Sequence, residues 1–191
     1  MKIYFTSDLH LDHTNVIKHC NRPFSSIEDM NNEIITQWNK IVHKNDIVYI
    51  LGDFSLTNNK DRFLNLADML KGDKYFVPGN HDRKTLNKID GVLKVLPQLT
   101  KIHAHNTEIV LCHFPIESWE NGRHGSVHLH GHSHGLGRAC PNRIDVGPDN
   151  VVNLDKTKQT GKWFHIWEIN ELLSLIKSQN EARELEFKRQ F

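Results

Sequence analysis

The chain has 191 residues, enough for one domain with a substantial core and slightly short for two. Charged residues make up 25% and hydrophobic residues 38%, and the net charge of +1 gives no electrostatic reason to expect a nucleic acid or a membrane as the main partner. No run reaches transmembrane length, none near the start resembles a signal sequence, and three cysteines without a CxxC pair indicate no zinc ribbon or disulfide framework. We therefore expect a cytoplasmic protein, in which the fourteen histidines are the unusual feature.

The first predicted element is a strand over residues 2–6, and polar residues including Asp8 and His10 follow it. Residues two apart in an extended chain lie on the same face, so these two side chains can serve one ion. Taken alone, Asp8 could equally cap a helix. The polar stretch continues to Asn21 and Arg22, which are candidate substrate-binding residues because a guanidinium can grip a phosphate with two hydrogen bonds. A plain structural arginine is the alternative.

Residues 27–42 and 60–70 have the apolar periodicity of helices. Each of these segments is followed by an apolar strand, at residues 46–51 and 74–77 respectively. Asp53 follows the first of these strands. The second is followed by three polar residues: Asn80, His81 and Asp82. Strands that alternate with helices predict an α/β layered domain, in which sites form beyond the carboxyl ends of the strands.

From residue 92 onward the apolar runs become short and are separated by Pro, Asn and Gly, which predicts a second, more antiparallel sheet. The runs are residues 92–95, 99–103, 108–112, 127–130 and 143–146. The expected architecture is a four-layer-like β-sandwich of two mixed sheets flanked by helices, in one domain over residues 1–191. A last helix is expected over about 167–190, and Trp163 and Trp167 near it are candidate contacts of a homodimer.

Three histidines follow strands of this second sheet: His113, His132 and His134. One histidine at a strand end is most often a hydrogen-bonded structural residue. The carboxylates and the amide at the other strand ends favour metal binding instead. Mixed oxygen and nitrogen ligation suits Mn²⁺, with Fe²⁺, Zn²⁺ or Ni²⁺ as alternatives, and the set exceeds what one ion needs, so two ions are the economical explanation. His128 and His130 alternate within a strand, so we expect them to be buried and hydrogen-bonded instead.

Five motifs occur in the order DxH, GD, GNHD, H and GHxH, and in this respect the chain resembles the calcineurin-like metallophosphoesterases, above all small single-domain bacterial and phage members. The resemblance spans residues 3 to about 147. It implies two ions that share Asp53 through its two oxygens. The implied ligand sets are Asp8, His10, Asp53 and His134 for one ion, and Asp53, Asn80, His113 and His132 for the other.

The resemblance also implies a mechanism. A water shared by two cations loses a proton near neutral pH and attacks phosphorus in line, so no protein nucleophile is required. His81 would contact the phosphoryl oxygen or protonate the leaving group, and Asp82 would accept a hydrogen bond from its other ring nitrogen, or cap a helix that begins near Arg83. Arg123, in a loop beside Trp119, could cover the metals and contact the substrate.

We therefore expect a dinuclear metal-dependent phosphoesterase that acts on a small phosphodiester or phosphomonoester, with a slight preference for nucleotide diesters because no cationic pocket for a dianion is visible beyond the metals. A nuclease acting on polynucleotides is one alternative, but the chain lacks a basic stripe interleaved with aromatic residues. A scaffold without catalytic activity is the other, although such a protein is expected to lose ligands that this chain retains.

Overall fold

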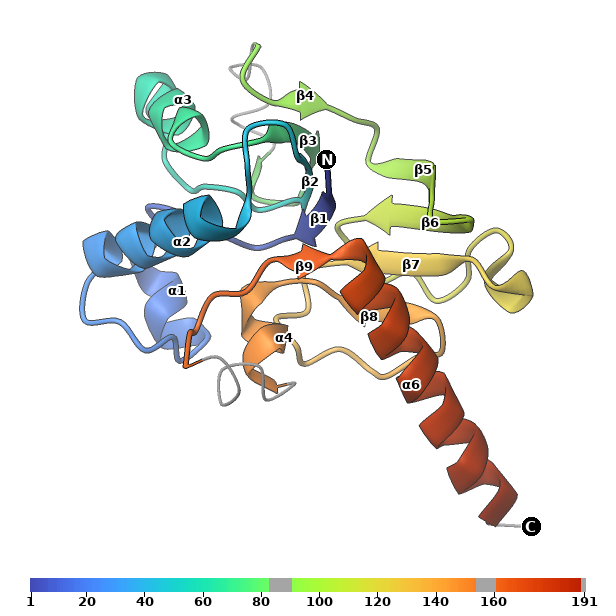
Figure 1. Ribbon diagram of the computed structural model, residues 1–191. Helices are drawn as coiled ribbons and strands as arrows, with labels where there is room; N and C mark the ends of the chain where they lie inside the picture. Colours follow the sequence, from blue (N-terminus) through green and yellow to red (C-terminus); the bar gives the residue numbers. More distant parts are fainter. Residues whose placement is uncertain (83–90, 154–160, 190–191) are drawn as a thin grey trace.

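The computed structural model describes residues 1–82, 91–153 and 161–189, and it forms two β-sheets packed face to face, with helices α2 and α3 on the far side of the first sheet (Figure 1). Residues 83–90, where a helix was expected to begin, lie outside the described part of the chain. The predicted architecture of two mixed sheets with flanking helices is confirmed. No helix among the described residues is long and apolar enough to cross a bilayer.

The first sheet has the strand order β4-β3-β2-β1-β9, in which β1 to β4 run parallel and β9 runs antiparallel to β1. Its strands are β1 Ile3–Thr6, β2 Ile47–Leu51, β3 Asp73–Val77, β4 Lys94–Val95 and β9 Trp167–Glu168. Helical crossovers connect the first three strands, as parallel pairing requires. These helices are α1 Thr14–His19, α2 Ile27–Ile41 and α3 Lys60–Asp68.

The second sheet has the order β5-β6-β7-β8, and only β5 and β6 pair in antiparallel fashion. Its strands are β5 Leu99–Ala104, β6 Thr107–Cys112, β7 Val127–His130 and β8 Arg143–Asp145. The expected antiparallel character was wrong for most of this sheet, because the long connections 113–126 and 131–142 allow parallel crossovers. The run 92–95 was also misassigned, since β4 joins the edge of the first sheet.

The C-terminal region begins as a strand and not as a helix. Trp167 pairs with Phe5 in the ladder between β1 and β9, and helix α6 extends over Ile169–Arg189. Trp163 and Trp167 are only 7% and 0% exposed, so they belong to the core and are not interface residues. The homodimer stays a prediction, without these tryptophans as its basis. A short helix that was not predicted, α4, spans Pro148–Asn153 after β8.

Two hydrophobic clusters hold the layers together, and strand alternation divides the residues of β1 between them. Tyr4 faces the cluster formed with α1, α2 and α3, where Trp38 is fully buried. Phe5 faces the cluster between the two sheets, which also receives the apolar side of α6, including Leu172. Because both faces of the first sheet are covered, the ends of its strands are the open places where polar groups can gather.

Candidate metal centre

All seven side chains that sequence analysis assigned to metal binding come from segments that follow the carboxyl ends of strands. Asp8 and His10 follow β1, Asp53 follows β2, and Asn80 follows β3. The second sheet contributes His113 after β6, and His132 and His134 after β7. The face-to-face packing of two sheets with parallel strands therefore brings residues separated by more than a hundred positions to one place.

The first group of these side chains surrounds an oxygen of Asp8. Its Oδ1 atom lies 3.8 Å from His10 Nε2 and 3.8 Å from His134 Nε2, and His10 Nε2 lies 3.7 Å from Asp53 Oδ2. Two donor atoms that each lie about 2.0–2.3 Å from one ion are roughly 3–4 Å apart. The group therefore has the spacing of ligands around a single cation.

The second group surrounds the side-chain oxygen of Asn80. His113 Nε2 and His132 Nδ1 each lie 2.9 Å from Asn80 Oδ1, and His113 Nε2 lies 3.5 Å from Asp53 Oδ2. His113 Nδ1 donates a hydrogen bond of 2.8 Å to the carbonyl of Leu51. Because the proton is on Nδ1, the Nε2 lone pair is directed at the other ligands.

One oxygen of Asp53 faces both groups, since the two contacts just given, to His10 and to His113, are to Oδ2. The other oxygen, Oδ1, accepts a hydrogen bond of 3.0 Å from the backbone N–H of His81. Sequence analysis expected each of two ions to bind a different oxygen of Asp53, and the observed arrangement differs from that expectation. Oδ2 is therefore the oxygen of Asp53 that lies near a nitrogen of each group.

The chemistry of the first group fits a divalent cation. Asp8 Oδ1 and His10 Nε2 are buried and have no hydrogen-bond partner within the described part of the chain. Burial raises the pKa of Asp8 to about 8, and the nearby Asp145 carboxylate contributes to the rise, while burial lowers the pKa of His10. Burying a carboxylate without a partner is costly. A cation between these two atoms would remove that cost.

Five of the seven side chains stand on left-handed backbone. The φ angles are 50° at Asp8, 52° at His10, 52° at Asp53, 66° at His132 and 46° at His134. Such a conformation costs a residue other than glycine roughly 1–3 kcal/mol and is concentrated at functional sites. Asp8 and His10 are therefore brought together by a turn and not by the extended chain that sequence analysis assumed.

Two motif glycines make room for these ligands. A Cβ atom at Gly131 would collide with Asp8 Oδ2 and would lie 2.5 Å from Ser7 Oγ. A Cβ atom at Gly79 would collide with Asp53 Oδ1. The glycines of the GHxH and GNHD motifs are thus required for the close approach of backbone to ligand, a reason the motif pattern alone did not supply.

Arg22 has a different role from the one expected. Its side chain is buried, and Nε and Nη2 donate to the two oxygens of Asp149 at 3.0 and 2.9 Å. Nη1 and Nη2 also donate to the carbonyls of Leu9 and Asp8, at 3.0 and 2.8 Å. With these donors occupied and the group enclosed, the Arg22 guanidinium does not reach a substrate, and it instead fixes the loop that carries Asp8.

Asp149 connects this arginine to the metal ligands. One of its oxygens accepts a hydrogen bond from His134 Nδ1 at 2.6 Å, which leaves His134 Nε2 facing Asp8. Carboxylates in this position fix the tautomer and ring orientation of a metal-binding histidine. Sequence analysis missed Asp149, because its Gly-Pro-Asp context indicated only a turn.

Asp82 does not contact the ring of His81, contrary to expectation. It is fully buried, and its Oδ2 accepts hydrogen bonds of 2.7 Å from the N–H groups of Asp53 and Gly79, while Oδ1 accepts one of 3.3 Å from Phe54 N–H. Burial raises the pKa of Asp82 to about 6. Asp82 therefore joins the loops after β2 and β3, and its helix-capping alternative involves residues outside the described part.

His81 lies at the rim of the centre. Its side chain is 45% exposed, and its Nε2 atom is 3.9 Å from Asp53 Oδ2. The ring of His10 is its neighbour at 5.6 Å between centroids. An imidazole that is half exposed and adjacent to the shared carboxylate can meet an incoming substrate from the solvent side.

The two remaining candidates lie on the surface. Arg123 is exposed in the short helix η3 Gly122–His124, which precedes β7, whereas His132 follows the other end of that strand. Trp119 beside it packs on His128 and donates to Ser126 Oγ, so this loop does not cover the centre. Asn21 is exposed after helix α1, with a left-handed φ of 50°.

The two histidines within β7 are structural, as predicted. His128 is 0% exposed and its ring contacts the carbonyls of Val110 and Phe114 and the N–H of Ile116. His130 is 4% exposed and its Nδ1 atom donates to the carbonyl of Gly131 at 2.8 Å. Both side chains are buried hydrogen-bonding groups outside the two ligand groups.

Comparison with known proteins identifies similar chains. A family model described as calcineurin-like phosphoesterase matches residues 1–174. The uncharacterized protein MJ1445 of Methanocaldococcus jannaschii is 39% identical over 134 residues, which cover 70% of this chain and 69% of that protein. The Gene 66 protein of Mycobacterium phage D29 is 26% identical over 195 residues, with 82% and 94% covered. The crystal structure of AQ665 from Aquifex aeolicus, a protein of unknown function, matches with a TM-score of 0.61 at 23% sequence identity. The match covers 81% of this chain and 98% of that one, and it supports the fold alone.

Proposed function

This chain belongs to the calcineurin-like phosphoesterase family, and from that premise we propose that it hydrolyses small phosphate esters at a centre of two divalent ions. One observation carries the proposal. A single oxygen, Asp53 Oδ2, lies 3.7 Å from His10 Nε2 in one ligand group and 3.5 Å from His113 Nε2 in the other. Two groups of ligands that share one carboxylate oxygen suit a pair of ions better than a single ion.

The proposed ligand sets keep the assignment that the resemblance implies: Asp8, His10, Asp53 and His134 for one ion, and Asp53, Asn80, His113 and His132 for the other. Two bound divalent ions supply positive charge that lowers the pKa of a bound water and offsets the negative charge on a reacting phosphoryl group. Oxygen and nitrogen donors without a thiolate favour Mn²⁺, with Fe²⁺, Zn²⁺ and Ni²⁺ as alternatives. Cys20 Sγ contacts His134 only at Nδ1, the atom that faces away from Asp8.

We assign proton donation to His81. Its ring is half exposed beside Asp53, and its backbone N–H binds the oxygen of Asp53 that does not face the ligand groups. The position of His81 is therefore tied to the shared carboxylate, within reach of a substrate oxygen that arrives from solvent. The role of Asp82 is to hold the backbone N–H groups of Asp53 and Gly79, and so to position the same carboxylate.

A small diester is the substrate class that the surroundings of the centre favour. Arg22 was a cationic side chain expected to bind the substrate phosphate, and its guanidinium is enclosed and bound to Asp149. A phosphodiester carries one negative charge less than a monoester dianion, so it depends less on such a cation. The near-neutral net charge of the chain argues against a polynucleotide.

The test combines metal analysis with a substrate screen. The metal-loaded wild type is expected to hold two ions and to hydrolyse bis-(p-nitrophenyl) phosphate or a 2′,3′-cyclic nucleotide faster than p-nitrophenyl phosphate. Asp53→Asn should lose metal and lower kcat/KM by more than about a hundredfold, since even residues that only orient ligands change affinity or activity by 10–100-fold. His81→Gln should keep both ions and lose rate.

Two outcomes would contradict the proposal. Asp53→Asn that keeps two ions and the wild-type rate would exclude the shared carboxylate. A wild type that binds no metal and has no turnover in the presence of Mn²⁺ would favour the scaffold alternative. Asp73→Asn serves as the matched control, because this exposed aspartate at the far end of β3 pairs with Lys94 at the surface.

A further inference from the structure

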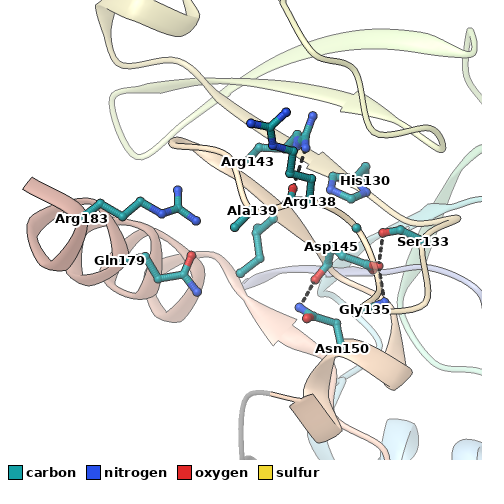
Figure 2. A pocket seen from close by; sticks show the side chains of 12 residues that line it. His130, Ser133, Gly135, Arg138, Ala139, Arg143, Asp145, Asn150, Gln179 and Arg183 are labelled. Carbon is teal, nitrogen blue, oxygen red and sulfur yellow. Dashed lines mark hydrogen bonds between the residues drawn. The ribbon is translucent and has the colours of Figure 1, made fainter. Parts of the chain in front are cut away.

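A second pocket lies behind the loop that carries His132 and His134. Its volume is about 220 Å³, and residues of that loop, of β7 and β8, and of helix α6 line it (Figure 2). None of the seven metal-site side chains is among its lining residues. Pockets for drug-sized ligands measure roughly 300–1,000 Å³, so this one suits a smaller molecule.

The lining is strongly cationic. Arg138 from the loop, Arg143 from β8 and Arg183 from α6 line the pocket, together with one carboxylate, that of Asp145. Among the described residues, no carboxylate forms an ion pair with any of these arginines. Asp145 is instead occupied, because its oxygens accept hydrogen bonds from Ser133 Oγ and from the N–H groups of Gly135 and Gly147. Three guanidinium charges gathered from separate elements repel one another unless an anion joins them.

The arginines differ in how far the protein already satisfies them. Arg143 Nη1 donates to the carbonyl of Ile116 at 2.8 Å, and Nη2 donates to that of Arg138 at 2.7 Å, so this guanidinium is held in place. Arg183 Nη1 is buried and has no hydrogen-bond partner in the described part of the chain. Figure 2 shows the Arg183 side chain on the helix, across the pocket from Arg138 and Arg143. A buried guanidinium nitrogen without an acceptor is costly, and an oxyanion in the pocket would supply that acceptor.

The pocket also offers neutral groups that distinguish an organic anion from a simple one. His130 lines it and is 4% exposed, and because its Nδ1 atom donates to the Gly131 carbonyl, its Nε2 atom is an acceptor. Asn150 and Gln179 add side-chain amides to the lining. Guanidinium donors beside an imidazole acceptor and amides match a ligand that carries both an oxyanion and hydroxyl groups.

We propose that this pocket binds a small organic phosphate, with the phosphate held by Arg138, Arg143 and Arg183 and the hydroxyl-bearing part by the neutral groups. The site is separate from the metal centre but adjoins it. Ser133 stands between His132 and His134, and its Oγ donates to Asp145 at 2.7 Å on the pocket side. The inference rests on the lining residues alone and does not depend on the proposed hydrolysis.

The experiment measures binding to the full chain after the metals have been removed with a chelator, so that phosphate has no ions to bind. Inorganic phosphate and ribose 5-phosphate are titrated separately by calorimetry. We expect saturable binding of one molecule of each, with the sugar phosphate the tighter. Arg183→Gln should weaken both by about tenfold or more, since charge-assisted bonds from arginine to phosphate are among the strong ones, and Arg138→Gln should weaken them too.

The matched control is Lys177→Gln, which removes a positive charge from the same helix at a residue that lies outside the pocket and pairs with Glu181. It should leave both affinities within about twofold of wild type, because a solvent-exposed charge at a distance is screened by salt. Equal weakening by Lys177→Gln and Arg183→Gln would overturn the proposal in favour of diffuse attraction. Absence of saturable binding, or inorganic phosphate binding more tightly than ribose 5-phosphate, would also overturn it.

Discussion

The two halves of the proposed metal centre satisfy their polar atoms differently. The first half consists of Asp8, His10 and His134, and the second of Asn80, His113 and His132. In the first, Asp8 Oδ1 and His10 Nε2 are buried without hydrogen-bond partners among the described residues. In the second, both imidazoles lie 2.9 Å from the oxygen of Asn80, and His132 is exposed. The first half therefore depends on a cation for its electrostatic balance, whereas in the second half water can reach the exposed ring of His132.

The halves also differ in how the surrounding protein supports them. Arg22 and Asp149 form a buried ion pair that holds His134 and the backbone at Asp8. The second half relies on hydrogen bonds from β7 and the chain after His113, where His128 contacts the backbone of Phe114 and Ile116. An ion in the first half should therefore be the more tightly held, because that half has both the unbalanced carboxylate and the stiffer support.

Acid should produce the largest effect, and it should act on the second half. Burial lowers the pKa of His128 to about 4. The unfolded chain, with an ordinary histidine pKa of about 6.5, binds the proton first as pH falls, so stability is fully present above pH 6.5 and is lost between about pH 6.5 and 4. This difference between the folded and unfolded pKa of His128 corresponds to a decrease of up to about 3 kcal/mol in the free energy of unfolding.

Denaturant unfolding of the metal-free protein at several pH values measures this loss. His128→Gln removes this titrating ring and should reduce the slope over that window without abolishing it, because burial also lowers the pKa of His10. The variant will be less stable at neutral pH. His103→Gln is the control, because that ring is mostly exposed, with its side chain 76% accessible, and it belongs to neither half. A slope that persists unchanged in His128→Gln would assign the acid sensitivity elsewhere.

Asp149→Asn should weaken the first half alone. The amide keeps the shape of the carboxylate but loses its charge and one of its two acceptor oxygens, so it cannot accept from Arg22 Nε and His134 Nδ1 at the same time. Removal of such a supporting carboxylate typically costs 10–100-fold in metal affinity. Competition with a chelator should therefore show that one ion is bound more weakly and that the affinity for the other is unchanged. Calorimetry measures the same two affinities without reference to activity.

Asp12→Asn provides the comparison for that variant, since Asp12 also pairs with an arginine, Arg62, but at the surface. It should leave both metal affinities within a few-fold of wild type. If Asp149→Asn weakened both ions equally, or if Asp12→Asn had the same effect, the support of the first half by Arg22 and Asp149 would be disproved.

The order of metal removal should give the smallest of these effects. Graded addition of a chelator to the wild type is expected to remove the ion of the second half first, with the two affinities differing by about tenfold or more, because that half offers a neutral amide in place of the Asp8 carboxylate. Loss of a Mn²⁺–Mn²⁺ coupling signal, measured by electron paramagnetic resonance, would mark the singly loaded state. Simultaneous release of both ions would contradict the difference between the halves.

Much of the centre was predictable from sequence, because each ligand stands in a local pattern. Asp53 and His113 directly follow apolar strands, and the glycines of the GD, GNHD and GHxH motifs mark the turns. The structure brings all seven predicted metal-site residues into the two ligand groups. Features that depend on distant partners were not predictable in the same way. Arg123 lies in the connection between β6 and β7, but this connection leads into the end of β7 that is opposite to His132. The path of a loop depends on what it packs against, so this position was not predictable.

Strand periodicity and turn glycines act over a few residues, so the order of amino acids was sufficient to place the ligands at strand ends and to pair them through the family resemblance. The groups that hold those ligands in position could be found only in the folded chain. Arg22 and Asp149 are 127 positions apart, and Asp82 binds the N–H of Asp53 and not the ring beside it. A buried polar group must find a partner wherever the packed chain presents one, and that choice is made by the packing of two sheets and not by spacing along the chain.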